Sequence, residues 1–247
     1  MKRRIYAKPP IVEAVIEMRF DGGRPWDQLL AARLQEAFKG TYPGEPRRTT
    51  RFEVQAKFEA ESVSTATRAG FHKLLLPSKD GTQLVGVGDS ILSMHVLAPY
   101  PGWEKFIAAT EDVLSTYREI AAPEQVLVIG IRYIDQIALP QDPNLAVSDY
   151  FPSVPARPRS MPAQLTAFHL VTEANDSTKG VVTLLTLASA PPTKEGRPVV
   201  LYDLNLIQTF PNPLPLDSWK PPLEKLHERQ RDIFEESITD QTRELFV

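Results

Sequence analysis

The chain has 247 residues, of which 42% are hydrophobic and 24% are charged, and its formal net charge is −3. This composition predicts a globular protein with a sizeable core, and the small net charge gives no overall field that would draw the chain to nucleic acid or anionic lipid. Cysteine is absent, which excludes disulfides, thiolate metal sites and a cysteine nucleophile.

The N-terminal segment predicts no signal peptide. It is basic at first, but Glu13 and Glu17 follow before an uninterrupted apolar stretch can form. No window of the sequence reaches the length of apolar run that spans a bilayer. We therefore expect a cytoplasmic protein with no membrane segment.

The elements in the first half follow from the spacing of apolar residues. Alternation with period two predicts strands, and recurrence at three and four residues predicts helices. The expected strands are residues 12–20, 51–59, 70–77, 82–87 and 90–97, and the expected helices are residues 26–38 and 102–120.

The second half shows the same signals, interrupted by many prolines. Proline fixes φ and has no backbone N–H, so the proline-rich stretches are expected to be ordered loops rather than sheet interior. The expected strands are residues 126–137, 164–172, 180–188 and 199–209, with a short helix within 144–151 and a closing helix over 223–238.

One short stretch occurs twice. Residues 15–20 read VIEMRF and residues 128–133 read VIGIRY, each with an Asp soon after, at Asp21 and Asp135. The start positions, 15 and 128, are 113 residues apart, and Trp103 and Trp219 precede the two long helices at a similar spacing of 116. Such spacings are domain-sized and predict a duplicated unit rather than a solenoid.

The expected fold class is therefore α+β, with two duplicated halves at residues 1–122 and 123–247 that could also form one continuous domain. Each half would contain a strand, a helix, three or four mostly antiparallel strands and a long closing helix. This order is similar to the TATA-binding-protein-like and helix-grip folds, in which a curved sheet wraps the closing helix. A fold of this kind does not define a function.

Polar residues on the repeated strand and on the last strand are the candidate ligand or partner residues. Alternation places Arg132 on one face of its strand and Tyr133 and Asp135 on the other. They could line a pocket between sheet and closing helix, or an Arg and an Asp could form an ion pair that joins the two halves. The full set is Arg132, Tyr133, Asp135, His169, Asp203 and Asn205.

No motif predicts catalysis or a cofactor. The sequence contains no G-x-S-x-G, P-loop, G-x-G-x-x-G or S-x-x-K, so no catalytic residue is assigned and an enzyme is disfavoured. Metal-site spacings are also missing, and we predict no metal site. The histidines concerned are His72, His95, His169 and His227.

A local basic patch is expected where Arg47, Arg48 and Arg51 enter a strand. Such a patch could contact phosphates. With a sequence pI of about 5.9, a solvated edge or a surface for a protein partner is the favoured interpretation.

Three stretches resemble a sporadically distributed bacterial family of uncharacterised proteins. The opening stretch has the pattern P-P-[I/L]-x-E-A at residues 9–14, the middle has an R-Y-[I/V]-N-like motif at residues 132–135, and the end has L-H, a spaced Phe and I-T within residues 226–239. Asp135 stands where the family more often has Asn. The resemblance implies a bacterial protein with the patchy distribution typical of mobile systems such as defence or toxin–antitoxin modules, and it carries no catalytic residues.

Three functions are compatible with these observations. The leading hypothesis is a non-enzymatic binding or scaffold protein of a mobile bacterial system that holds a protein partner, with a homo-oligomer also open. The alternative is a small-ligand pocket protein or an enzyme of helix-grip type. The third is nucleic-acid binding through the basic patch.

Overall fold

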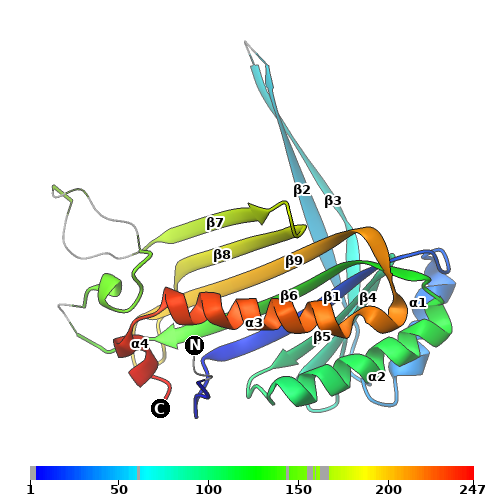
Figure 1. The fold of residues 1–247 in the computed structure, drawn as a ribbon, viewed down its shortest axis with the longest axis horizontal. Coiled ribbons are helices and arrows are strands. Elements are labelled where there is room, and N and C mark those ends of the chain that lie inside the picture. Colours follow the sequence, from blue (N-terminus) through cyan, green and yellow to red (C-terminus); the bar gives the residue numbers. More distant parts are fainter. Residues whose placement is uncertain (1–3, 60–61, 143–144, 155–157, 159, 162–166) are drawn as a thin grey trace.

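A single antiparallel sheet of nine strands runs through the chain, and its helices lie on one face (Figure 1). The computed structural model describes residues 4–59, 62–142, 145–154, 158, 160–161 and 167–247, and for residues 51–59 and 62–71 it describes the backbone. The strand order is β2-β3-β4-β5-β1-β6-β9-β8-β7. The strands are β1 (Ile11–Asp21), β2 (Arg47–Glu59), β3 (Ser62–Pro77), β4 (Gln83–Gly88), β5 (Ile91–Leu97), β6 (Gln125–Ala138), β7 (His169–Asp176), β8 (Val181–Ala190) and β9 (Val199–Pro215).

Helices cover the apolar face of this sheet. The α-helices are α1 (Gln28–Phe38), α2 (Trp103–Ala121), α3 (Lys220–Ser237) and α4 (Asp240–Glu244), and the 3₁₀ turns are η1 (Val147–Asp149) and η2 (Leu216–Ser218). Residues Ala14, Ile16 and Met18 of β1 are almost fully buried toward the helices. The apolar residues that alternate along this strand therefore lie on the covered face of the sheet, and the residues between them lie on the uncovered face.

The helix ends agree with the local sequence. Asp27 caps α1, because its side-chain oxygen accepts a hydrogen bond from the backbone N–H of Leu30 at 2.7 Å. Helix α2 follows Gly102, which has a positive φ of 96° and provides no side-chain cap. Helix α3 carries proline in its first turn, where the missing N–H removes no helical hydrogen bond.

The predicted architecture of two duplicated halves with curved sheets is wrong, because the strands form one nine-stranded sheet. The two similar stretches lie in β1 and β6, which pair with each other in the middle of one sheet, with Ile16 opposite Ile131. A strand inside a sheet needs hydrogen-bonding partners along both edges. Strands β1 and β6 each provide that partner for the open edge of the other. The order of elements also differs, because the only helix described between β6 and β7 is the short 3₁₀ turn η1.

The expected elements otherwise correspond to observed ones with shifted ends. The short helix expected within 144–151 is the 3₁₀ turn η1, and the strand expected at 164–172 is β7, which begins at His169. The starts of both predictions, at residue 144 and at residues 164–166, lie outside the described residues.

Strands β2 and β3 form a ribbon that projects well beyond the sheet (Figure 1). They pair with each other from Arg47 opposite Leu75 to Glu59 opposite Ser62. Only the end of β3, from Leu74 to Pro77, pairs with β4. Most of the ribbon therefore has no further strand beside it in the sheet.

Close backbone packing at Gly88 gives a test of the β3–β4 junction. A Cβ added at Gly88 would lie 2.4 Å from the carbonyl oxygen of His72, a backbone atom that cannot move independently. We expect Gly88→Ala to lower the free energy of unfolding by about 1–3 kcal/mol, measured by urea denaturation. Gly40→Ala is the matched control, because no atom lies within 4 Å of the added Cβ. Equal stabilities of the two variants would contradict the packing at this junction.

Candidate functional site

The residues predicted to form one site lie on two faces of the sheet. Tyr133 and Asp135 lie on the face of β6 that the helices cover, whereas Arg132 and Asn205 line a groove on the uncovered face. Successive strand residues point to opposite faces, so the separation follows from the alternation along β6. His169 is exposed at the start of the edge strand β7.

The predicted basic residues lie at the start of the projecting ribbon. Arg47 and Arg48 are exposed neighbours in β2, so their side chains leave the strand on opposite faces. The side chain of Arg51 lies outside the described residues.

A pocket of about 410 Å³ lies between the middle of the sheet and α3, and we call it the helix-side pocket. Strand β6 provides its floor, α3 and the start of α2 provide walls, and the N-terminal residues 4–7 and 9–11 border it. The lining residues that matter for its chemistry are Tyr100, Trp103, Tyr133, Asp135, His227 and Arg231.

Asp135 places a buried carboxyl group at this pocket. The residue is only 2% exposed, and its Oδ1 has no hydrogen-bond partner in the described part of the chain. Burial, with a smaller contribution from the negative charge of Asp203, raises the pKa of Asp135 to about 8. Asp135 is therefore mostly protonated at neutral pH and can act as a hydrogen-bond donor. The one other buried side-chain atom without a partner among the described residues is the hydroxyl of Thr183.

Aromatic side chains surround the polar floor. The hydroxyl groups of Tyr100 and Tyr133 lie 3.0 Å apart, and the Tyr133 hydroxyl lies 3.4 Å from Nδ1 of His227. The His227 ring stacks on Trp103 with 3.7 Å between ring centroids and 9° between planes. Burial raises the pKa of Tyr100 to about 12, so its hydroxyl keeps its proton in the physiological range. The pocket therefore contains a network of hydroxyl and imidazole groups between flat aromatic walls.

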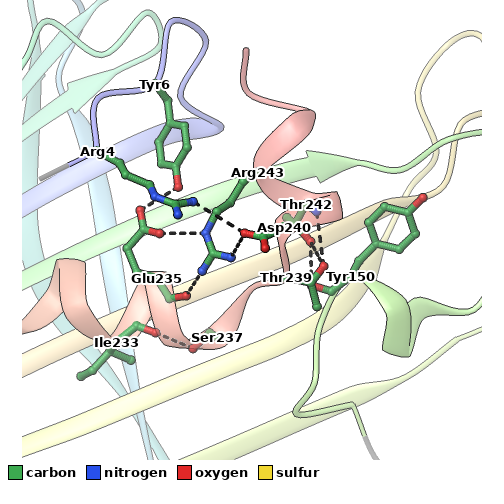
Figure 2. Close-up of polar contacts among 10 residues, drawn as sticks. All are labelled: Arg4, Tyr6, Tyr150, Ile233, Glu235, Ser237, Thr239, Asp240, Thr242 and Arg243. Carbon is green, nitrogen blue, oxygen red and sulfur yellow. Dashed lines mark hydrogen bonds and ion pairs between the residues drawn. The ribbon is translucent and has the colours of Figure 1, made fainter. Parts of the chain in front are cut away.

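The N-terminal segment is fastened to the C-terminal helices at the side of the pocket (Figure 2). The Tyr6 hydroxyl donates to Glu235 at 2.7 Å, and Nε of Arg243 donates to the same carboxylate at 3.0 Å. Arg243 also pairs with Asp240 at 2.8 Å, and Arg4 lies 3.8 Å from Asp240. Glu235 borders the pocket, but its charge is already balanced by these partners.

The uncovered face carries a second, polar hollow of about 360 Å³, which we call the helix-free groove. A chain of contacts crosses it. Lys73 Nζ lies 2.7 Å from Glu17 and donates to Ser93 Oγ at 3.2 Å. Ser93 Oγ lies 2.9 Å from His95 Nε2, and His95 Nδ1 lies 2.7 Å from Glu13. Charged and polar groups in this groove thus satisfy one another.

Ser93, His95 and Glu13 contact one another in the same succession as the nucleophile, base and orienting acid of a catalytic triad. Ser93 is completely buried, however, and Lys73 donates to the oxygen that would have to attack a substrate. Burial lowers the pKa of His95, which leaves a neutral ring able to link Ser93 to Glu13 by hydrogen bonds. We interpret this arrangement as a structural hydrogen-bond network rather than a catalytic triad.

Arg132 and Asp203 form the predicted kind of ion pair, with Nε to Oδ1 at 2.8 Å. The pair joins β6 to β9, so it lies within the second half of the chain and does not connect the halves. Asn205 is directly opposite Arg132 in the same ladder. Arg132 and Asn205 line the helix-free groove, and none of the three residues lines the helix-side pocket.

The sequence interpretation missed most of the pocket wall. His227 was one of four isolated histidines, and its signal was its position among the apolar residues of the closing helix, between Leu223 and Phe234. Trp103 and Tyr100 carried no signal of a site, because aromatic residues near a helix start are ordinary core residues. In the part of the chain that the structure describes, no group of three metal-ligating side chains lies close together.

Comparison with known proteins finds no family model that matches this chain and no match among curated proteins. The resemblance noted from the sequence therefore stays a prediction. Among the described residues, no helix is both long enough and apolar enough to cross a membrane.

Replacement of Asp135 by Asn should change how stability depends on pH. The carboxyl is protonated in the folded state up to a pKa of about 8 but ionises near pH 4 in the unfolded chain, so rising pH favours unfolding between these values. Relative to Asp135→Asn, we expect the wild type to lose about 1.4 kcal/mol per pH unit across this window. Urea denaturation at pH 5, 7 and 9 measures the difference.

Asp232→Asn is the control for this experiment, because Asp232 is a solvent-exposed carboxylate on α3. Its stability should follow the wild type at each pH. Parallel pH profiles for Asp135→Asn and the wild type would show that Asp135 is not held in a protonated, buried state.

Proposed function

We propose that the protein binds a small ligand in the helix-side pocket. The observation that carries this proposal is the buried carboxyl of Asp135, whose Oδ1 has no partner among the described residues. A buried polar group without a hydrogen bond destabilises the folded protein by about 1–3 kcal/mol. A ligand that supplies the missing hydrogen bond would remove this penalty in the bound state.

The size and lining of the pocket support binding of a drug-sized or smaller molecule. Its volume of about 410 Å³ falls in the range of small-molecule sites. Such sites combine mostly apolar walls with a few convergent polar groups. Here Trp103 and Phe234 provide wall surface, and Tyr133 and Asp135 provide polar atoms on the floor. Our proposal is binding rather than catalysis.

Benzamide is a suitable probe because it is flat, neutral and able to accept a hydrogen bond from Asp135. We expect saturation-transfer NMR to detect benzamide on the wild type, and Asp135→Leu to weaken its affinity about tenfold or more. The same Leu substitution should leave stability at pH 7 equal or higher, because it replaces an unpaired polar group by an apolar one of similar size.

Thr183→Val is the matched control for the benzamide experiment. It removes the other buried polar atom without a partner in the described chain, and Thr183 does not line the helix-side pocket. This variant should bind benzamide as the wild type does. Unchanged binding by Asp135→Leu, or a clear loss of its stability, would contradict a ligand-binding role for Asp135.

A protein partner held on the uncovered sheet face is the second function that we propose, as expected from the sequence. What favours it is the Arg132–Asp203 pair, which is partly exposed on a face that no helix of the described chain covers. The partner would present a polar surface of mixed charge. A defence or toxin–antitoxin setting in a bacterium belongs to the same proposal.

Co-purification at native expression tests the partner. We expect a second protein to be retained by the wild type and lost by the exchanged variant Arg132→Glu/Asp203→Arg, which keeps an internal ion pair but inverts the charge pattern. A wild-type chain that runs as a lone monomer would count against this second function.

A further inference from the structure

We propose that the helix-side pocket recognises a carboxylate carried on a flat apolar body, with Arg231 as the residue that pairs with the carboxylate. This inference rests on the proposed ligand-binding function and names the chemical class of the ligand. Three features of the pocket lead to it: a cation without a partner among the described residues, buried hydrogen-bonding groups and a helix N-terminus.

Arg231 is the cation. It lies on α3, it lines the pocket and it is partly buried. No ion pair or hydrogen bond joins its guanidinium to another residue in the described part of the chain. Burial raises the pKa of Tyr133 well above its ordinary value, and the positive charge of Arg231 opposes that shift. A planar guanidinium matches a carboxylate with two parallel hydrogen bonds.

The other charged groups around the pocket have partners of their own, so Arg231 is the cation that a ligand would pair with. Glu235 is bound by Tyr6 and Arg243, and Arg4 lies near Asp240. Among the described lining residues, the remaining carboxylate is Glu104 in the first turn of α2, and it has an interaction of its own.

Hydrogen-bond donors converge on the same space. The Tyr133 and Tyr100 hydroxyls keep their protons because burial raises the pKa of both, and they form one network with each other and with Nδ1 of His227. Asp135, with a pKa raised to about 8 by burial, is mainly a neutral acid at pH 7 and donates rather than repels. A neutral carboxylic acid beside a tyrosine hydroxyl can hold an anionic oxygen in an apolar site.

The N-terminus of α2 adds to this preference for an anion. Residues 101–104 line the pocket, and the helix follows Gly102, which offers no side chain to cap the first backbone N–H groups. Free N–H groups and the helix dipole favour a negative charge at this end. The independent observation at the same pocket is the buried Asp135 with its unpartnered oxygen.

The walls determine the shape of the ligand body. Trp103 and His227 stack in parallel at 3.7 Å, and Phe234 and Tyr100 line the same pocket. Flat apolar surfaces of this kind accommodate a flat ring by stacked or edge contacts. The ligand is therefore an aromatic or similarly planar carboxylate rather than a compact inorganic anion.

Three probes of one shape separate the alternatives: benzoate, neutral benzamide and cationic benzamidine. We expect benzoate to bind the wild type more tightly than benzamide, and benzamidine to bind most weakly, by ligand-observed NMR titration at pH 7. Arg231→Met should weaken benzoate about tenfold or more and leave benzamide nearly unchanged. Arg231→Lys keeps the charge but not the paired hydrogen bonds, so its affinity for benzoate should be intermediate.

Arg229→Met is the matched control on the same helix, because Arg229 lies 3.6 Å from Asp176 and does not line the pocket. It should bind all three probes as the wild type does. If benzamide binds and depends on Asp135, while benzoate is no tighter or is unaffected by Arg231→Met, the carboxylate assignment is overturned and the ligand-binding function stands. Tighter binding of benzamidine than of benzoate also overturns the assignment. If none of the probes binds, the ligand-binding function itself is contradicted.

Discussion

The pairing of β1 with β6 is the contact on which the rest of the structure depends. Each of these strands has one neighbour from its own half of the chain, β5 or β9, and the two join along their remaining edges. This ladder makes one sheet with one covered face, and it places Tyr133 opposite Ala14 beneath the helices. The helix-side pocket has a continuous floor because the two halves share this sheet.

The two hollows of the sheet differ in how their charges are balanced. In the helix-free groove, Lys73 is paired with Glu17, and Arg132 is paired with Asp203. In the helix-side pocket, Arg231 and Asp135 have no such partners among the described residues. Paired charges are compatible with a purely structural role, whereas a cation without a partner and a buried carboxyl without a hydrogen bond leave part of their interactions unmade. This difference supports ligand binding on the covered face, whereas the residues that the sequence predicted to form one site lie on both faces.

Much of the local structure was predictable from residue periodicity, and most of its assembly was not. The alternation in residues 12–20 correctly separates Glu13 and Glu17 from the buried Ile16. The choice of partner for a strand edge is a non-local property, since residue spacing defines faces but not neighbours, so the sequence predicted two similar strands but not that they pair with each other. Part of the site was predictable, because alternation places Tyr133 and Asp135 on one face of their strand. Arg231 and Trp103 were not predictable as neighbours, because they come from helices whose positions only the complete fold defines.

The position of β1 in the sheet also has a consequence for the order in which the chain folds during synthesis. Strand β1 is made first, but its neighbours β5 and β6 follow only after about 70 and about 100 further residues. The first five strands and two helices can therefore associate while β6 is still unmade, and one edge of β1 then stays open as a template for any extended segment. The emergence of β6 closes that edge, so a nascent chain is most exposed to wrong strand pairing just before its centre is completed.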